Sequence, residues 1–237
     1  MIHTDKYAGS ELELFAQAHN WKAYFRKILA PHIRGKILEV GAGIGGTTRV
    51  LRGLTQGPWT CLEPDKELVE QLRVTIATEL LRADAEVGTL RSLPEVPTFD
   101  TILYIDVLEH IEHDAEELAE AAKRLNPGGT IVVLSPAHGW LFTPFDSAIG
   151  HFRRYNKEGL RALCPATCLN RDLFYLDSVG MLASGANRLL LKSAMPSKAQ
   201  IAVWDRIMIP ATVVVDRLTG HRLGKSIVAT YELRSAP

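Results

Sequence analysis

The stretch that decides the fold is residues 37–47, which read Ile37-Leu38-Glu39-Val40-Gly41-Ala42-Gly43-Ile44-Gly45-Gly46-Thr47. Its mostly apolar start is typical of a short buried strand, and a helix is expected from Thr47 onward. The glycines between them let the backbone take positive φ angles and let a ligand approach closely. The start of the helix then offers free N–H groups. We therefore predict a ligand-binding loop over residues 41–46.

Strands and helices alternate along the first part of the chain. We expect strands at 36–40, 59–63, 85–88, 101–105 and 130–135, and helices at 47–54, 65–79 and 115–125. Such alternation builds right-handed βαβ units and a parallel sheet. Outside this part we expect an amphipathic N-terminal helix at 10–30, a strand pair at 172–177 and 226–233, and a helix at 198–218 bent at Pro210.

Composition narrows the class of protein. The 237 residues carry 27 Lys+Arg and 27 Asp+Glu, so the zero net charge gives no field that favours nucleic acid. The three cysteines fit a reducing, cytoplasmic compartment. Cys164 and Cys168 lie close in sequence, but no further Cys or His ligands of a zinc site stand near them, so we predict no metal. We find no pattern of a signal peptide and no apolar stretch long enough to span a membrane.

Two cofactors fit the glycine loop. Read as Gly41-x-Gly43-x-x-Gly46, the loop matches the dinucleotide fingerprint, with Glu63 placed 20 residues after Gly43 as a ribose-binding acid. Glu39, however, stands two residues before Gly41. Its carboxylate can face the cationic amino-acid end of a ligand and would repel a pyrophosphate. This feature argues against a nicotinamide cofactor.

Two later segments complete the pattern. Residues 99–111 read FDTILYIDVLEHI, an apolar strand that ends in an acidic, polar rim, and residues 125–133 read LNPGGTIVV, a helix end, a turn and a strand. Together with the glycine loop they resemble the class I S-adenosylmethionine-dependent methyltransferases over residues 36–136. The resemblance implies an α/β, Rossmann-like doubly wound fold. Its mostly parallel seven-stranded sheet would have helices on both faces and an antiparallel last strand, with an N-terminal helix and C-terminal cap elements.

By this resemblance, the cofactor is S-adenosyl-L-methionine. The residues expected to bind it are Glu39, Gly41, Ala42, Gly43, Gly45, Glu63, Pro64, Thr89, Leu90, Asp106 and Val107. Glu39 would anchor the methionine part, and Glu63 would accept both ribose hydroxyls because its two oxygens match two vicinal donors. The family's Asp beside the adenine has no clear counterpart. We place Thr89 there in preference to Asp84, so a hydroxyl or a backbone N–H would replace the carboxylate.

Residues 136–156 show no periodicity and hold the most unusual side chains. A long irregular segment in a compact domain is usually functional. The part from His138 to Tyr155 resembles a small-molecule subgroup of the same superfamily. We expect Trp21, Trp140, Phe142, Asp146, Arg153, Arg154 and Tyr155 to contact the acceptor. The arginines would bind a carboxylate or phosphate on the acceptor. The alternative is a structured loop whose arginines pair with Asp and Glu.

Methyl transfer to a hydroxyl requires removal of a proton, and histidine is the natural base near neutral pH. Our candidates are His151 first, His138 second, and His110 on the rim of the fourth strand. The predicted function is transfer of a methyl group to an oxygen or nitrogen of a small molecule. The alternatives are a cofactor-binding protein with other chemistry, such as cyclisation, or without activity. The last alternative is an NAD-dependent oxidoreductase.

The predicted layout is a single domain over residues 1–237. It consists of a lid helix at 10–30, a cofactor-binding core at 36–136, a substrate and cap region at 137–225 and the last strand at 226–233. An apolar stretch at 201–215 would complete the cap or an oligomer contact, so both a monomer and a homodimer are compatible. The same stretch could shelter the acyl or prenyl chain of a lipid-linked acceptor.

Overall fold

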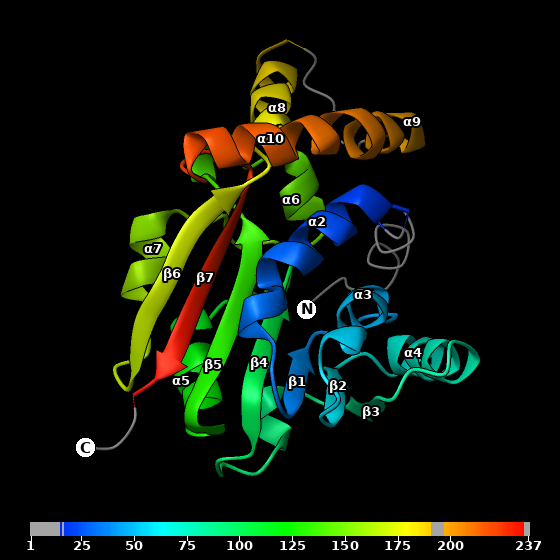
Figure 1. Ribbon diagram of the computed structural model, residues 1–237, viewed down its shortest axis with the longest axis vertical. Coiled ribbons are helices and arrows are strands. Elements are labelled where there is room, and N and C mark those ends of the chain that lie inside the picture. The colour runs from blue at the N-terminus through cyan, green and yellow to red at the C-terminus, as the bar shows by residue number, and fades with distance from the viewer. Residues whose placement is uncertain (1–14, 16, 191–196, 235–237) are drawn as a thin grey trace.

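A computed structural model describes residue 15, residues 17–190 and residues 197–234. A seven-stranded sheet crosses the molecule in the order β3-β2-β1-β4-β5-β7-β6 (Figure 1). The strands are β1 (Ile37–Val40), β2 (Trp59–Glu63), β3 (Asp84–Val87), β4 (Phe99–Ile105), β5 (Leu125–Pro136), β6 (Cys168–Leu176) and β7 (Ser226–Leu233). β1 to β5 pair in parallel, whereas β7 runs antiparallel to both β5 and β6. The predicted fold class is confirmed.

Helices cover both faces of the sheet. They are α2 (His19–Leu29), α3 (Gly46–Leu51), α4 (Lys66–Thr78), α5 (Asp114–Lys123), α6 (Pro144–Ala148), α7 (Lys157–Ala162), α8 (Ser178–Leu190), α9 (Lys198–Val203) and α10 (Ile209–Thr219). Short 3-10 turns lie between them, and a π-helical turn, η6 (Trp204–Met208), joins α9 to α10. In Figure 1, α2 lies in front of the sheet and α5 behind it, while α8 to α10 form a layer beyond the carboxyl ends of the parallel strands.

The central strands are buried on both faces, as parallel strands between helix layers must be. Alternate residues of β4 enter two apolar clusters: Ile102 and Tyr104 pack with α5, and Leu103 and Ile105 pack with α2 and α10. Trp59, 1% exposed, is among the largest fully buried side chains and lies in the second cluster. The carboxyl edge of these strands is thereby held between two packed layers.

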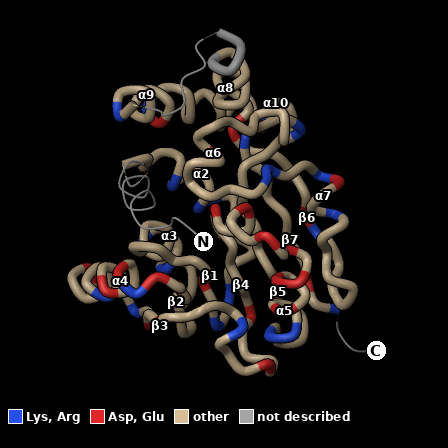
Figure 2. The backbone as a smooth tube through the Cα atoms, turned by 180° about the vertical axis from the view of Figure 1, so that it is seen from behind, with Lys and Arg blue, Asp and Glu red and all other residues tan. Residues whose placement is uncertain are grey.

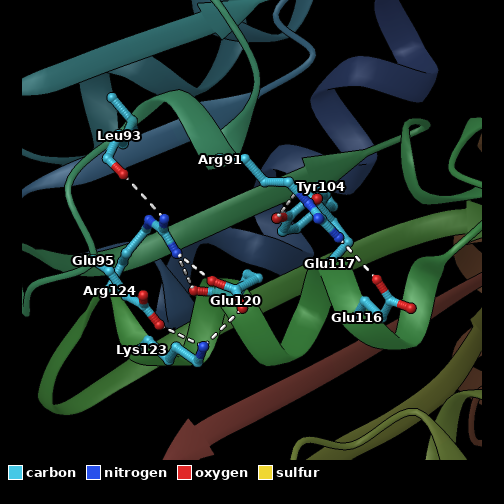
Figure 3. A network of polar contacts seen from close by, with 9 residues as sticks. All are labelled: Arg91, Leu93, Glu95, Tyr104, Glu116, Glu117, Glu120, Lys123 and Arg124. Carbon is cyan, nitrogen blue, oxygen red and sulfur yellow. Dashed lines mark hydrogen bonds and ion pairs between the residues drawn. The ribbon is translucent and has the colours of Figure 1, made fainter.

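Polar contacts fasten α5 to the loop that precedes β4 (Figure 3). The guanidinium of Arg124 donates to the carbonyl oxygen of Leu93 at 3.0 Å and to the carboxylate of Glu120 at 3.1 Å. The hydroxyl of Tyr104 donates to Glu117 at 2.9 Å. Because Arg124 is only 3% exposed, this anchor is interior rather than superficial. It fixes the helix that follows the polar rim of β4.

Several predicted boundaries differ from the structure. Helix α2 begins at His19, and residues 10–14 and 16 of the expected 10–30 helix lie outside the described residues. The expected turn at residues 126–129 is an irregular segment without registered pairs inside the long strand β5, and helices α6, α7 and α8 were not anticipated. In the expected 198–218 helix, the irregularity is the π turn before Pro210. Pro210 itself lies in the first turn of α10, where its missing N–H costs nothing.

Within the described part of the chain, no helix combines the length and apolarity needed to cross a lipid bilayer.

Candidate active site

The glycine loop connects β1 to α3 at the switch point of the sheet, where β1 has β2 on one side and β4 on the other. Ligands in open α/β sheets bind at such a point. Gly41 has a φ of +67°, and a Cβ there would lie 2.6 Å from a methyl carbon of Val107. Gly45, at φ +86°, caps α3 in a left-handed conformation. The two loops after β1 and β4 therefore approach each other too closely for a side chain at Gly41.

Glu39 is a buried carboxylate with one satisfied oxygen. Its Oε2 accepts hydrogen bonds from the hydroxyl of Thr48 at 2.7 Å and from the indole N–H of Trp59 at 2.9 Å. Its Oε1 is buried and has no hydrogen-bond partner among the described residues. Burial raises the pKa of this carboxyl to about 7, although the hydrogen bonds oppose the shift. The geometry leaves one acceptor for a donor supplied by a ligand.

Glu63 closes the second strand against the glycine loop. Its Oε2 accepts the backbone N–H of Gly43 at 2.9 Å, and its Oε1 accepts that of Asp65 at 3.1 Å. Burial raises its pKa, while these two hydrogen bonds oppose the shift. Each carboxylate oxygen can accept a second hydrogen bond, so a pair of vicinal hydroxyls still fits. Pro64 follows it at an exposed position.

The loop after β3 separates the two candidates for the adenine side. Thr89 is exposed and directly follows Gly88 at the carboxyl end of β3, whereas Asp84 is the first residue of that strand and lies at the opposite edge. Leu90 is fully buried, so only its backbone could face a ligand. The position of Asp84 is consistent with our preference for Thr89, and the contact with adenine stays a prediction.

The rim after β4 starts with a strained residue. Asp106 has a φ of +54° and donates its backbone N–H to the carbonyl oxygen of Leu134 at 2.7 Å. Desolvation by the surrounding protein raises the pKa of the Asp106 carboxyl, and the nearby charges of His151 and Lys225 oppose this rise. The rim of β4 therefore lies within electrostatic reach of the segment that follows β5.

His151 is fixed by carboxylates on both sides. Its Nδ1 lies 2.9 Å from Oδ1 of Asp146, and its Nε2 lies 3.9 Å from Oε1 of Glu109. Asp146 is fully buried and also receives two guanidinium N–H bonds from Arg154, at 2.7 and 3.0 Å, and two bonds from Thr143. Burial disfavours the ionised form of Asp146, but the bonds from His151 and Arg154 outweigh it and hold its pKa well below the usual range.

A second imidazole completes this cluster. The rings of His110 and His151 meet edge to face with centroids 4.5 Å apart. Desolvation, with the charge of His151 adding to it, lowers the pKa of His110 to about 4. Glu109, His110 and His151 also place three ligand atoms within 4.8 Å of one another, the one such group in the described residues that could accept a metal ion. The prediction that no metal binds therefore stays open.

His138 lies apart from that pair. It has a φ of +64°, stacks on Tyr175 with ring centroids 4.7 Å apart, and donates its backbone N–H to Tyr155 at 2.7 Å. Its Nε2 is buried and has no hydrogen-bond partner in the described structure. Burial lowers the pKa of this imidazole. Of the three predicted bases, the structure thus brings His110 and His151 together. It places His138 elsewhere, with its Nε2 buried and its ring stacked on Tyr175.

Residues 153–155 are held by protein groups. Arg153 forms an ion pair with Asp114 at 2.8 Å, and the hydroxyl of Tyr155 donates to the same carboxylate at 2.8 Å. Arg154 pairs with Asp146 at 2.7 Å. This is the structured-loop alternative, in which the arginines pair with acids of the chain. Anion binding by these arginines stays a prediction, and it would require both ion pairs to rearrange.

The predicted aromatic residues divide between core and surface. Trp21 is 7% exposed and packs in the cluster between α2 and the cap, with its ring 5.9 Å from that of Trp204. Trp140 is 54% exposed and lies against α8, because a Cβ at Gly185 would be 3.5 Å from its ring. Phe142 ends the 3-10 turn that follows His138. Their contact with an acceptor stays a prediction.

Two acidic residues of the candidate site were not predicted from the sequence. Asp114 joins Arg153 and Tyr155 to the rim of β4, but as the first residue of a helix it resembles an ordinary acidic N-terminal residue. Glu109 is not among the site residues predicted from the sequence, whereas the structure places it fully buried beside His151. A buried acid next to two histidines becomes visible only when residues 109 and 151 are brought together by folding.

Comparisons with known proteins agree with this geometry. Residues 37–129 match a family described as a methyltransferase domain, and no curated protein matches the sequence significantly. Among solved structures, a complex of the Haloferax volcanii Trm112 methyltransferase activator with a methyltransferase aligns at 17% identity and a TM-score of 0.67, covering 99% of both chains. Geranyl diphosphate methyltransferase with its methyl donor aligns at 12% identity and a TM-score of 0.65, covering 98% of this chain and 93% of the other.

A third structure, the [4+2]-cyclase SpnF, aligns at 16% identity and a TM-score of 0.62 and covers 96% of each chain. Because these solved structures share at most 17% sequence identity with the chain, they establish only its fold. The family match identifies residues 37–129 as a methyltransferase domain. The matched residues include the glycine loop, Glu39, Glu63 and the rim of β4. The chain therefore carries a methyltransferase domain, matched over residues 37–129, on the class I fold of S-adenosylmethionine-dependent methyltransferases.

Proposed function

We propose that this enzyme transfers a methyl group to an oxygen or nitrogen of a small-molecule acceptor bound at the rim of β4. S-adenosylmethionine supplies the methyl group on a sulfonium. In this proposal the unpartnered Oε1 of Glu39 faces the cationic methionine end, and Glu63 accepts the ribose hydroxyls. Gly41 lets the loops after β1 and β4 approach each other, because a side chain there would overlap Val107. Thr89 lies toward the adenine.

The observation that carries the proposal is the pairing of His151 with Asp146. With Asp146 accepting the proton of Nδ1 at 2.9 Å, the neutral ring keeps its lone pair on Nε2. That nitrogen faces Glu109 at 3.9 Å and lies beside His110. A base oriented by a buried carboxylate is the arrangement that general base catalysis requires.

Proton transfer follows from this arrangement. His151 would take the proton of the acceptor on Nε2. Bound S-adenosylmethionine would supply the methyl group to the acceptor atom, and the bond between the methyl carbon and the sulfonium sulfur would break, leaving neutral S-adenosylhomocysteine. The imidazolium that forms then lies between the carboxylates of Asp146 and Glu109, which stabilise its charge. Because the side chain of His151 is only 8% exposed, water has little access to it. His110 stays neutral and can position the acceptor.

The small-molecule assignment has separate support. The chain has no net charge to attract nucleic acid, and its fold matches that of geranyl diphosphate methyltransferase. A comparable likeness to a [4+2]-cyclase, with a TM-score of 0.62 against 0.65, keeps cyclisation as the second candidate. The two candidates predict different fates for the cofactor, because only methyl transfer consumes it.

The test is formation of S-adenosylhomocysteine with a panel of phenols, carboxylates, amines and phosphorylated alcohols. For the acceptor that reacts, we expect His151→Gln to lower kcat about 10²- to 10⁴-fold, the usual contribution of a general base. Binding of S-adenosylhomocysteine, measured by calorimetry, should stay unchanged. The exposed His113 provides the matched control, because its substitution His113→Gln should leave both quantities intact.

Two outcomes would contradict the proposal. Cofactor that binds but is never consumed while an acceptor cyclises would favour the second candidate. Activity that a chelator abolishes and a divalent ion restores would assign Glu109, His110 and His151 to a metal site instead of proton transfer.

A further inference from the structure

The cap presents an apolar outer face. The run from α9 through η6 to α10, residues 198–219, is roughly 30 Å long at 1.5 Å per residue. Four large apolar side chains recur along it at helical spacing and are exposed: Val203 (46%), Ile207 (66%), Val214 (57%) and Leu218 (81%). Pro210 lies between them and is exposed as well. A stripe of this kind on a protein surface marks a contact site.

The opposite face of the same run is anchored in the protein. Asp205 accepts the backbone N–H groups of Asn20 and Trp21 at 3.2 and 2.8 Å and so holds the start of α2. Asp216 accepts the hydroxyl of Tyr24 at 2.7 Å and the backbone N–H of Asp177 at 2.9 Å. Both acids are buried, Asp205 at 4% exposure and Asp216 at 0%. The outer face is therefore fixed in orientation.

The outer face is also one-sided in charge. Asp205 and Asp216 are the only acidic residues between positions 178 and 223. The charged residues that this run and the turn after it expose are Lys198, Arg206, Arg217 and Arg222. In Figure 2, Lys and Arg mark the ends of the layer formed by α9 and α10. A run whose exposed apolar side chains alternate with exposed cations, and which exposes no acid of its own, has the pattern of a helix that lies in the headgroup region of an anionic bilayer.

We propose that the outer face of α9, η6 and α10 docks on the surface of an anionic lipid bilayer. Exposed cations along the stripe complement acidic headgroups, and the apolar side chains enter the acyl boundary. A second copy of the chain is the less suitable occupant. A two-fold contact would place Arg206 and Arg217 of both copies at one interface, and this face exposes no acid to pair with them.

The neighbouring helix α8 adds a further exposed apolar side chain to the cap. α8 follows β6 directly and packs on η6 and α10, and its Leu182 is 68% exposed. In Figure 1, α8 to α10 lie together beyond the carboxyl ends of the strands, on the side of the candidate active site. Docking through this layer would hold the active-site edge of the sheet toward the bilayer. The inference does not depend on which atom is methylated.

The test is sedimentation of the full chain with two kinds of vesicle. One contains phosphatidylcholine alone and is neutral, and the other contains phosphatidylcholine with about 30% phosphatidylglycerol and is anionic. We expect binding to the anionic vesicles only, weakened by salt. Two variants probe the two components: Ile207→Asp for the apolar stripe and Arg206→Glu with Arg217→Glu for the charge. Each should lower the partition coefficient at least tenfold.

Matched controls lie on α4 and on the turn before β4. Val74 is 62% exposed on α4, so Val74→Asp adds the same charge to an equally exposed apolar position. The double variant Lys66→Glu with Arg91→Glu is the control for charge, because it changes the net charge by the same amount as Arg206→Glu with Arg217→Glu. Both controls should bind vesicles like the parent. Thermal melting of every variant shows whether the fold is kept.

Several results would overturn the proposal. These are no binding to either vesicle, equal binding to neutral and anionic vesicles, or equal loss in the Val74→Asp control. A concentration-dependent dimer in the absence of lipid that Ile207→Asp dissociates would assign the face to a second copy. Cofactor binding and methyl transfer to a water-soluble acceptor are measured separately, so failure here leaves the proposed reaction untouched.

Discussion

Glu39 makes the stability of the free enzyme depend on pH in an unusual direction. Its carboxyl is fully buried, Oε2 accepts bonds from Thr48 and Trp59, and Oε1 has no partner among the described residues. Burial raises its pKa from 4.5 to about 7. The folded protein therefore binds a proton more tightly than the unfolded chain does. The perturbation that isolates this effect is Glu39→Gln, which removes the titration and keeps the shape.

The size of the effect follows from linkage. Each unit of pKa difference corresponds to about 1.4 kcal/mol, so a shift from 4.5 to about 7 amounts to roughly 3 kcal/mol. Below pH 4.5 both states are protonated and the cost is absent. As the pH rises through the window from about 4.5 to 7, the free energy of unfolding falls, and above pH 7 the full cost of the buried charge is present.

The assay is urea unfolding of the cofactor-free protein at pH 5, 6, 7 and 8. Relative to Glu39→Gln, the parent should lose roughly 2.5 kcal/mol of unfolding free energy between pH 5 and pH 8, because part of the cost is already present at pH 5. The two proteins are compared by the slope of unfolding free energy against pH and not by its absolute value, because the carboxamide of Gln also changes the hydrogen bonds to Thr48 and Trp59. Glu86→Gln at an exposed position of β3 is the control and should run parallel to the parent. Parallel curves for the parent and Glu39→Gln would refute the reasoning.

Three further predictions concern the cofactor loop and the cap. Glu63→Gln should weaken binding of S-adenosylhomocysteine about 10- to 100-fold by calorimetry, since hydrogen bonds to a charged group contribute about 1.5–3 kcal/mol. Gly41→Ala should abolish that binding and lower the melting temperature, whereas Gly128→Ala, with a similar φ of +73° but no atom within 4 Å, should cost only backbone strain. Asp177→Ala removes the buried acceptor of the Trp204 indole, at 2.7 Å, and should lower the free energy of unfolding by about 3–5 kcal/mol in a urea titration.

The part of the fold built from local patterns was predictable. Five alternating strands and the order of the glycine loop, Glu63 and the rim of β4 follow from hydrophobic periodicity and turn residues. The structure confirms these strands within a few residues, apart from β5, which begins at Leu125 rather than Thr130. The Pro127-Gly128 pair indicated a turn, and residues 126–129 form an irregular segment inside β5. Leu125 pairs with Phe99 and Thr130 pairs with Thr101, so the register shifts across this segment, and Gly128 has a φ of +73°. The strand accommodates the local turn signal as a bulge.

The candidate site was predictable in its residues and not in its contacts. His151 and Arg154 were singled out by type, yet sequence could not tell whether Arg154 would bind an acceptor or Asp146. The structure brings the guanidinium and the imidazole to the same carboxylate, at 2.7 and 2.9 Å. That geometry depends on the short helix α6, whose capping box with Thr143 aims Asp146 inward. No pattern in residues 136–156 predicted such a helix.

Backbone strain explains why the carboxyl edge of the sheet resists prediction. Asp106, His138 and Asp177 follow β4, β5 and β6, and all three have φ between 54° and 66°. A non-glycine residue in this conformation costs about 1–3 kcal/mol and persists only where tertiary contacts determine it. Each backbone N–H donates to a partner distant in sequence. Asp106 donates to the carbonyl oxygen of Leu134 at 2.7 Å, and His138 donates to that of Tyr155 at 2.7 Å. Asp177 donates to the carboxylate of Asp216 at 2.9 Å. The folded core thus stabilises strained turns where acceptor and cofactor would meet, which orients this edge before any ligand binds.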